Sequence, residues 1–368
     1  MDLTADQVAW HRMRRSGLIE PFASAPEAAA ALLGVQSQFV TPSGLSLRNR
    51  LASDFTESDL DRLLHDERVL IRTWGQRNTV HVYSVADWPT FTAATQRLSL
   101  FQERYLKHFG GSADDLRDAV VLTGQLLRDR DRACRADLLA AEPSLTAWTQ
   151  IGNGLMMDLA RQGLSCHAGL EGGRSYFAHR DVWLPGLGWD PPSPEAAGIS
   201  LTSRYFGTYG PATVRDLAFW FGGKMKEAKA WVAALGDDLV EVRVGDETLL
   251  ASAADLDEIA QQPPPRADWP IRLLHRFDPL VLCHKDKSWL IDEAHYKAVW
   301  RKAGYVEAVL LMEGRIAGVW RYDKKGKGID ITLEPFEKLP AGIASILEPQ
   351  ALDVADYLGV ELRSFKVG

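Results

Sequence analysis

One order of segments recurs along this chain, and it constrains the fold more than any single motif does. Segments with helical periodicity come first, and two short runs rich in β-branched and aromatic residues then flank a turn. The paired runs are residues 69–74 with 78–84, 164–169 with 175–179, and 239–244 with 247–252. Helices followed by a hairpin is the winged-helix order, so the sequence predicts a structural repeat of three such units.

Capping residues mark the helices of the first unit. Thr4 opens a T-x-x-Q capping box, and Thr56 begins a third helix. Between them, a helix is expected to start at Ser24, with proline in its first turn, and to end at Gly34. The segment GVQSQFV, residues 34–40, therefore lies just beyond a helix end.

The last hundred residues follow the proline run at 263–265 and have a different sequence pattern from the part of the chain before them. They contain strand-like runs linked by glycine turns, at 280–284, 305–312, 315–322 and 328–334, then a helical stretch at 340–358 and a final strand at 361–367. We therefore expect an α+β protein with these domains: winged helix 1 at 1–85, a helical linker at 86–112, winged helix 2 at 113–190, winged helix 3 at 191–262, and a small β-rich domain at 266–368.

Composition places the chain among folded globular proteins. It has 368 residues, of which 46% are hydrophobic and 25% charged, enough for several domains. No apolar run is long enough to span a bilayer, and the first residues lack the features of a secretory signal, so a cytoplasmic protein without membrane contact is expected. The three cysteines lack disulfide or zinc spacing and are expected to be reduced and buried.

Charge is distributed unevenly along the chain. The whole chain has a formal charge of -7, which argues against indiscriminate coating of nucleic acid. Residues 272–327, in contrast, hold twelve Lys/Arg against seven Asp/Glu, a net of +5. The cluster at the end of this stretch consists of Arg315, Arg321, Lys324, Lys325 and Lys327. It fits either contacts to a polyanion or a solvated basic face.

Several catalytic patterns are absent. The chain has no GxxxxGK[ST], no GxGxxG after a strand, no HExxH and no GxSxG. Its nine histidines are scattered, and the nearest pair, His275 and His284, suits a structural role as well as metal binding. We therefore expect no metal and no other cofactor, and a hydrolase or transferase for small molecules is disfavoured.

Five stretches of the chain resemble one family of proteins, in that family's order. They are GVQSQ at 34–38, IRTWGQRNTVHV at 71–82, YGPATVRDLAFWFG at 209–222, LLHRFDPLVLCHKDK at 273–287, and GRIAGVWR at 314–321. Together they resemble the AlkZ-like, or YcaQ-type, winged-helix DNA glycosylases of bacteria over nearly the whole chain. In two details the sequence departs from that family: Asn78 stands where glycine is common, and Gln76 where an apolar residue is common.

The resemblance implies a C-shaped arrangement of tandem winged helices with a small C-terminal β-domain, holding double-stranded DNA in its concavity. Members hydrolyse the N-glycosidic bond of alkylated purines, and some act on bulky adducts or interstrand crosslinks. The family's catalytic motif falls here on Gln36 and Gln38. In the branch with glutamine at both positions, crosslink unhooking and self-resistance to a genotoxic metabolite are the usual assignments.

The chemistry of an N7-alkylated purine explains how two neutral amides could suffice. The base already carries positive charge, so it leaves without a general acid, and catalysis consists of stabilising the sugar cation and holding a water in line. A glutamine carbonyl can accept a hydrogen bond from that water. If residues 35–39 are extended, Gln36 and Gln38 share one face, while Val35, Ser37 and Phe39 face the protein. Judged by the residues alone, two solvated loop amides remain an alternative.

The first hairpin and the last domain supply candidate contacts to DNA. The DNA-binding candidates are Arg72, Arg77, Thr79, His81, Arg315, Arg321, Lys324, Lys325 and Lys327. Arg72 and His81 could equally be paired within the first domain, and Trp74 is expected in the core. The expected partner is duplex DNA with alkylated purines, bound by a monomer. The main rival is a non-catalytic winged-helix regulator or lesion sensor.

Overall fold

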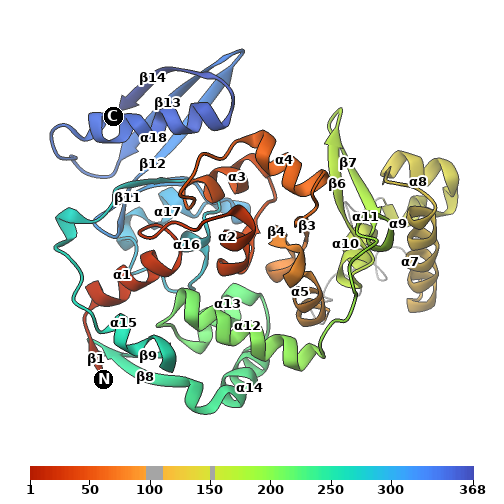
Figure 1. Ribbon diagram of the computed structural model, residues 1–368, viewed down its shortest axis with the longest axis horizontal. Coiled ribbons are helices and arrows are strands. Elements are labelled where there is room, and N and C mark those ends of the chain that lie inside the picture. The colour runs from red at the N-terminus through yellow and green to blue at the C-terminus, as the bar shows by residue number, and fades with distance from the viewer. Residues whose placement is uncertain (97–110, 150–153) are drawn as a thin grey trace. The chain divides into compact units, whose positions relative to one another are not determined.

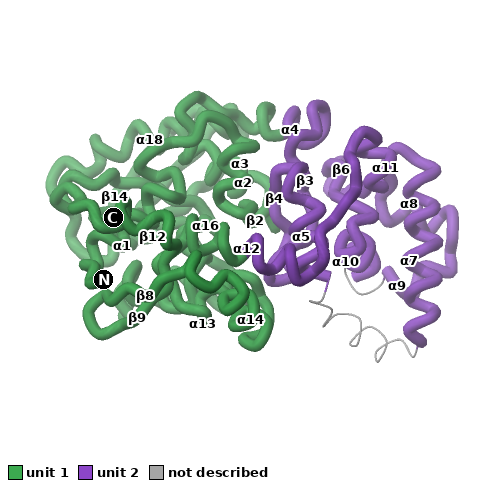
Figure 2. Tube along the Cα trace, turned by 60° about the horizontal axis from the view of Figure 1, so that its bottom comes forward, with its two compact units in different colours: residues 1–60, 202–368 green, residues 61–201 purple. Residues whose placement is uncertain are grey.

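The computed structural model describes residues 1–96, 111–149 and 154–368, which form helices and several sheets, so the chain is an α+β protein as expected (Figure 1). Its residues divide into two compact units (Figure 2). Unit 1 consists of residues 1–60 and 202–368, and unit 2 of residues 61–201. A compact unit can contain more than one domain, so the domain boundaries stay a prediction.

Unit 1 contains a five-stranded sheet with the order β10-β11-β12-β13-β14. Neighbouring strands are antiparallel up to β13, and β13 and β14 are parallel, with helix α18 between them in sequence. The elements are β10 (Arg272–Leu274), β11 (Ala308–Met312), β12 (Arg315–Lys325), β13 (Gly328–Pro335), α18 (Ile343–Tyr357) and β14 (Glu361–Val367). The predicted strands at 305–334, the helix at 340–358 and the final strand are thus confirmed.

The expectation of a strand at 280–284 is wrong. Residues Pro279–Leu282 form a short helix, α16. The Asp278 side chain caps this helix by accepting from the Leu280 amide at 3.0 Å, and Pro279 occupies the first turn. An N-cap aspartate followed by proline is a helix start, and it overrides the β-branched composition of the run.

Further helices of unit 1 are α1 (Ala5–Arg15), α2 (Ala25–Ala31), α3 (Val40–Arg48), α13 (Val214–Phe221), α14 (Met225–Leu235), α15 (Leu256–Ile259) and α17 (Tyr296–Val299). Helix α12 (Pro194–Tyr209) begins in unit 2 and ends in unit 1. The hairpin of β8 (Leu239–Val244) and β9 (Glu247–Ser252) forms as predicted, and β1 (Asp2–Leu3) pairs parallel to β8. The start of α1 is the predicted capping box of Thr4 and Gln7.

Unit 2 is built on two antiparallel hairpins that join edge to edge. Its strands lie in the order β4-β3-β6-β7-β5, and β3 meets β6 where Arg72 is opposite His167. The strands are β3 (Leu70–Trp74), β4 (Val80–Ser84), β5 (Ala133–Cys134), β6 (Ser165–Glu171) and β7 (Arg174–His179), which confirms both predicted hairpins.

An apolar cluster of unit 2 includes Trp74, as expected for that residue, and is built mainly by side chains of three of the unit's helices, α7 (Ala113–Arg128), α8 (Arg135–Ala141) and α10 (Gly154–Arg161). The unit also contains α5 (Trp88–Thr95), α9 (Thr146–Thr149) and α11 (Arg180–Trp183); α4 (Glu57–His65) runs across the boundary between the units. The predicted linker helix is confirmed at 88–95, and the part at 97–110 lies outside the described residues.

One helix of unit 1, α3, was not expected from the sequence. It contains Pro42, Ser43 and Gly44, which are poor helix formers. Gly44 is required because a Cβ atom there would lie 1.7 Å from the Tyr357 hydroxyl oxygen of α18. The close approach of these two helices therefore selects glycine against its helix propensity.

Two further sequence expectations concern cysteines and membranes. Cys134, Cys166 and Cys283 are free and buried, as predicted. Among the described residues, no helix has the length and apolar character needed to cross a bilayer.

Candidate active site

The segment that carries Gln36 and Gln38 follows a firmly closed helix end. Leu33 and Gly34 both adopt positive φ, of 57° and 90°, and the Gly34 amide donates to Ala29 O at 2.9 Å. The left-handed position after the C-cap residue Leu32, where glycine is common, is held here by Leu33, and Gly34 follows it, so the helix ends beside the predicted glycine. Val35–Gln36 then forms the short strand β2.

Side chains of α12 hold the same helix end from outside. Arg204 Nη2 donates to Ala30 O at 2.8 Å, Thr208 Oγ1 to Ala31 O at 2.8 Å, and Tyr209 Oη to Leu32 O at 2.7 Å. The carbonyls of a helix's last turn lack the usual intrahelical partners, although Ala30 O also accepts from the Leu33 amide at 3.0 Å. The position of the following segment is thus fixed by α12, although α12 is distant in sequence.

Tyr209 extends this support to the 273–287 stretch. His284 Nε2 lies 2.8 Å from Tyr209 O, and His284 Nδ1 lies 2.9 Å from Cys283 Sγ. Burial, together with the charges of Arg12 and Lys287, keeps the pKa of His284 well below its usual value. The neutral ring donates through Nε2, so His284 has a structural role.

The residues after the helix end do not alternate in exposure as expected, because Val35, Gln36 and Ser37 are all buried, whereas Gln38 and Phe39 are both exposed. Val35 and Ser37 are buried as predicted, and Gln38 is exposed. Ser37 Oγ lies 2.9 Å from Ser43 Oγ, which ties the segment to α3. Gln36 is itself 9% exposed, so most of its side chain is enclosed.

The expectation that Phe39 faces the protein is wrong, since the side chain is 55% exposed. Its ring stacks at 6.2 Å, between centroids, on that of Phe277. Phe39 immediately precedes α3, whose first residue is Val40, so the extended conformation of the segment ends there and a helix begins.

A buried ion pair anchors the chain just after α3. Arg50 Nη1 and Nη2 donate to the two carboxylate oxygens of Asp278 at 2.8 and 2.7 Å, and both side chains are fully enclosed. Arg50 also donates to the carbonyls of Ser16 and Ser46, at 2.7 and 2.9 Å. Because planar bidentate pairing fixes direction as well as distance, this pair locks α3 to the start of α16.

In unit 2, His81 is paired within its own hairpin. Its Nδ1 lies 3.0 Å from Thr79 O, and Arg77 Nη2 lies 3.4 Å from its Nε2. Burial and the Arg77 charge hold the pKa of His81 well below its usual value, so the ring is neutral and accepts from Arg77. This geometry favours the alternative reading of His81 as an internally paired residue.

The other candidates on this hairpin differ in setting. Arg72 lies in the central strand β3, opposite Val82 on one side and His167 on the other, and burial lowers its pKa to about 10. Thr79 ends the turn, and its hydroxyl donates to Gln76 O at 3.3 Å. Their roles as DNA contacts stay predictions.

Both departures from the family pattern are accommodated in the turn. Asn78 has φ 57°, a left-handed conformation that asparagine tolerates better than most residues, and its Oδ1 accepts from Arg161 Nη2 at 2.6 Å. Gln76 is buried and accepts a hydrogen bond from the Tyr83 hydroxyl. The hairpin therefore forms with these residues in place of glycine and an apolar side chain.

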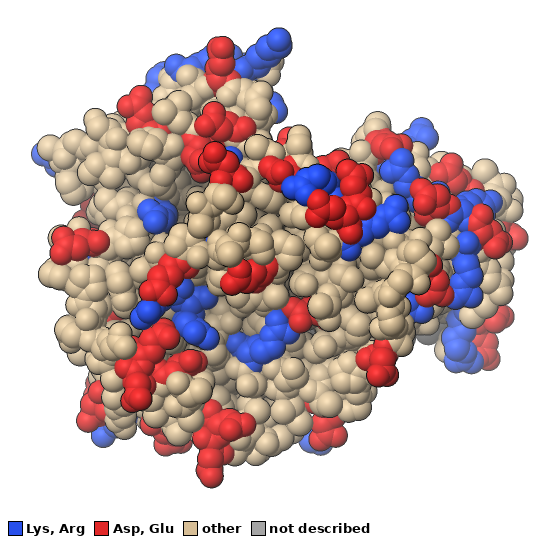
Figure 3. All heavy atoms as spheres, in the orientation of Figure 1, with Lys and Arg blue, Asp and Glu red and all other residues tan. Residues whose placement is uncertain are grey.

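The basic residues of the last domain lie along one hairpin, as predicted, but many of them are paired. Arg315 donates to Asp292, Arg321 to Glu334 at 3.0 Å, and Lys325 Nζ lies 2.6 Å from Asp323. Lys324 and Lys327 are exposed near the turn. Figure 3 shows that Lys and Arg on this face are interspersed with Asp and Glu rather than gathered in one continuous patch.

The histidines do not form a metal site in the described part of the chain, where no cluster of three His, Cys, Asp or Glu side chains could hold an ion. His275 is buried edge-on against Trp320 at 5.1 Å between centroids. Burial and the Arg50 charge lower its pKa to about 3.

The sequence analysis missed Asp216, which connects two of the family-like stretches. Its Oδ1 accepts from the amides of Lys285 and Asp286 at 2.7 and 3.2 Å, while its Oδ2 completes the capping box of Thr213. The T-x-x-D pattern before an apolar run was a visible signal of the cap. Nothing local in the sequence indicated the second set of bonds.

Known proteins resemble this chain over most or all of its length. The profile of the family "DNA glycosylase AlkZ-like" matches residues 29–357. A curated relative from Streptomyces sahachiroi, named interstrand DNA cross-link repair glycosylase, is 28% identical over 382 residues, covering 96% of this chain and 95% of the relative.

A solved structure shows the same fold. The DNA glycosylase AlkZ of Streptomyces sahachiroi superposes with a TM-score of 0.85 at 24% identity, and the match covers 100% of both chains. The expected resemblance is confirmed, and since the family profile spans most of the sequence, the chain belongs to the AlkZ-like DNA glycosylase family.

Proposed function

We propose that this DNA glycosylase hydrolyses the N-glycosidic bond of N7-alkylated purines, including bases held in interstrand crosslinks, with Gln36 and Gln38 at the deoxyribose. The observation that carries the proposal is the placement of two amides on either side of the buried Ser37, directly after a helix end that α12 holds in place. A fixed segment is what transition-state stabilisation requires, because its dipoles need no reorganisation during the reaction.

The two amides have different surroundings, which suggests a division of roles. Gln38 is exposed and is the amide that a water or a sugar can reach. Gln36 is largely enclosed, which suits a side chain that orients its neighbour and turns its dipole towards the cationic sugar. In the reaction, the C1′–N9 bond breaks with its electrons passing to the cationic base, water adds to C1′, and the proton of that water is lost.

Crosslinked substrates are included for a physical reason and because of the relative's name. A base tied to the opposite strand cannot be swung out of the duplex into a deep pocket, as most glycosylases require. The relative from Streptomyces sahachiroi is named as a cross-link repair glycosylase. This proposal also includes a finer interpretation of the fold. In it, the three hairpins are the wings of winged-helix units, and these units together hold duplex DNA.

Release of free base from lesion-containing DNA tests the proposed reaction. We expect the protein to liberate 7-methylguanine from duplex DNA in the presence of a metal chelator, detected by chromatography. With DNA crosslinked through guanine N7 atoms, denaturing gels run without heat or alkali should show separated strands only after incubation with the protein. Binding to such DNA without release of base would instead favour the non-catalytic regulator or lesion sensor.

The tip of the β12–β13 hairpin is proposed to contact the DNA backbone. Changing Lys324, Lys325 and Lys327 together to alanine should weaken binding to all duplex sequences and lower the slope of log K against log salt by up to about three units, near one unit per phosphate contact. Because Lys325 is paired with Asp323, a loss nearer two units is expected. Fluorescence anisotropy over a range of salt concentrations measures the slope.

Arg321 provides a comparison for this triple variant, because its guanidinium already pairs with Glu334 and lies 3.4 Å from Glu307. Arg321→Ala should lower the slope by less than one unit. A triple lysine variant with an unchanged slope would show that the hairpin tip does not touch DNA.

A further inference from the structure

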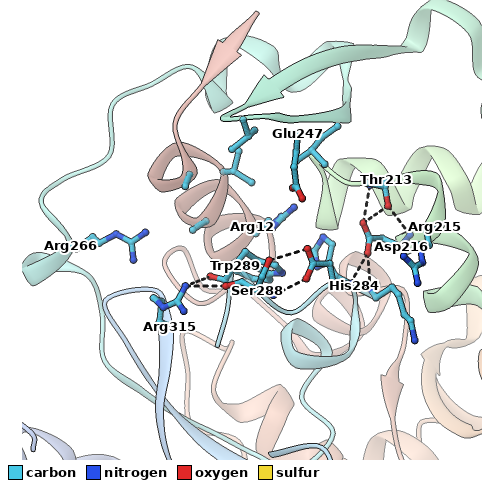
Figure 4. Close-up of a pocket in the computed structure, with 17 residues that line it drawn as sticks. Arg12, Thr213, Arg215, Asp216, Glu247, Arg266, His284, Ser288, Trp289 and Arg315 are labelled. Atoms are coloured by element: carbon cyan, nitrogen blue, oxygen red, sulfur yellow. Dashed lines mark hydrogen bonds between the residues drawn. The ribbon is translucent and has the colours of Figure 1, made fainter. Parts of the chain in front are cut away.

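Unit 1 contains a second site, a pocket of about 630 Å³ between α1, the start of α13 and the segment after α16. Figure 4 shows the residues that line it, with Arg12 reaching in from α1. Its volume lies in the range of small-molecule sites. Neither Gln36 nor Gln38 lines it, and of the candidate DNA contacts only Arg315 does.

Arg12 is the unusual residue of this pocket. The side chain is 4% exposed, and within the described part of the chain it forms no ion pair. One guanidinium nitrogen donates to Pro211 O, the group lies 4.5 Å from the centre of the Trp289 ring, and its enclosed Nε has no hydrogen-bond partner among the described residues. A buried guanidinium without a directly paired anion is costly, since several kcal/mol of hydration are lost.

The lining of the pocket carries charges of both signs. Five Lys or Arg and three Asp or Glu line the pocket, a net of +2. They are Arg12, Arg215, Arg266, Lys285 and Arg315 against Asp216, Glu247 and Asp286.

Not all of these charges are available to a ligand. Arg266 is paired with Asp6 at 2.7 Å, and Arg315 with Asp292. The carboxylate of Asp216 accepts only from neutral backbone and hydroxyl donors, so it keeps its charge, and the remaining lining has three cations and three carboxylates. Arg12, Arg215 and Lys285 are therefore the cations that remain for a bound anion, and the latter two are exposed at the rim.

We propose that this pocket binds a phosphate group, with Arg12 as the fixed cation at its base and Arg215 and Lys285 as outer contacts. Planar guanidinium groups match phosphate oxygens in geometry. The group could belong to a free phosphorylated molecule or to the DNA backbone, and the proposal does not depend on the glycosylase reaction.

Pyrophosphate is the probe for the free form of the ligand. Calorimetric titration of the whole chain at low salt should give saturable binding. The double variant Arg215→Ala with Lys285→Ala should weaken that binding about tenfold or more, because each lost contact is a charge-assisted hydrogen bond. These side chains are exposed, so the variant is expected to fold, and circular dichroism would verify this.

The matched control removes two exposed lysines outside the pocket, Lys226 and Lys297, one on α14 and one on α17. Changing both to alanine should leave pyrophosphate affinity within about twofold of the starting protein. Equal losses in the two double variants would mean general charge attraction and would overturn the proposal.

Lesion-free duplex DNA distinguishes the two sources of phosphate. If the DNA backbone is the ligand, the pocket variant should lower the salt slope of DNA binding by about one to two units, and pyrophosphate should compete with the duplex. If the ligand is a free molecule, pyrophosphate binds and the slope is unchanged. The proposal would be overturned if pyrophosphate did not bind saturably and the slope of the duplex did not change.

Discussion

Replacing either Gln36 or Gln38 with alanine should slow the release of 7-methylguanine by about 10²- to 10³-fold, which is the usual effect of removing one fixed dipole or hydrogen-bond acceptor from a transition state. The cationic base leaves as readily as before, but the sugar cation and the attacking water lose a partner. Single-turnover rates with excess enzyme measure the chemical step directly.

Affinity for the same duplex should change little in these variants, because neutral amides contribute little to the electrostatic attraction of DNA. Gln125, an exposed glutamine of α7, is the matched control, and Gln125→Ala should keep the full rate. If both active-site variants retained the full rate, the assignment of the two glutamines would be wrong. If they lost binding and rate together, their role would lie in holding DNA.

The largest effect on folding is expected at the Arg50–Asp278 pair. Asp278→Asn leaves an enclosed guanidinium without its counter-charge and should lower the free energy of unfolding by about 3–5 kcal/mol. Asparagine can still cap α16, so the loss reports mainly on the ion pair. Denaturant unfolding followed by tryptophan fluorescence measures it.

The matched control for Asp278→Asn is Glu20→Gln, which removes the charge of an exposed partner of Arg14 at 2.8 Å. That change should cost about 1 kcal/mol or less. Replacing Arg50 and Asp278 together with leucine should recover part of the loss, since no unpaired charge is then buried. Equal losses in Asp278→Asn and Glu20→Gln would show that the buried pair contributes no more than a surface pair.

The hairpins were predictable because their information is local. Residues 69–84 and 239–252 combine β-branched or aromatic strands with short turns, and the structure has strands in those places. The capping box at Thr4 and the end of α2 close to Gly34 were predictable for the same reason.

Other features depend on contacts that the local sequence does not encode. Helix α3 contains Gly44, a poor helix former, because the distant Tyr357 leaves no room for a side chain at this position. Likewise, Arg50 is enclosed only because Asp278 meets it from 228 residues away. The strand expected at 280–284 is the exception, because the Asp-Pro start of α16 could have been recognised.

The features of the two candidate sites likewise differ in how far the sequence predicts them. The pair Gln36 and Gln38 was found from spacing together with the family resemblance, and the sequence could not show that Gln36 would be largely enclosed. The Arg12 pocket was not foreseen at all. Its lining comes from four separate parts of the chain, around residues 5–12, 213–216, 244–249 and 284–289, with Arg266 and Arg315 in addition.

The discontinuity of unit 1 has a consequence during synthesis on the ribosome. Its first 60 residues, which carry the two glutamines, pack with residues 202–368, so their partners are translated only after all of unit 2. Unit 2 is one continuous stretch of the chain and can fold as soon as it has emerged from the ribosome. Apolar side chains of the amino-terminal segment, such as Met13 and Leu18, therefore stay uncovered until residues 269–319, which pack against them, have been made.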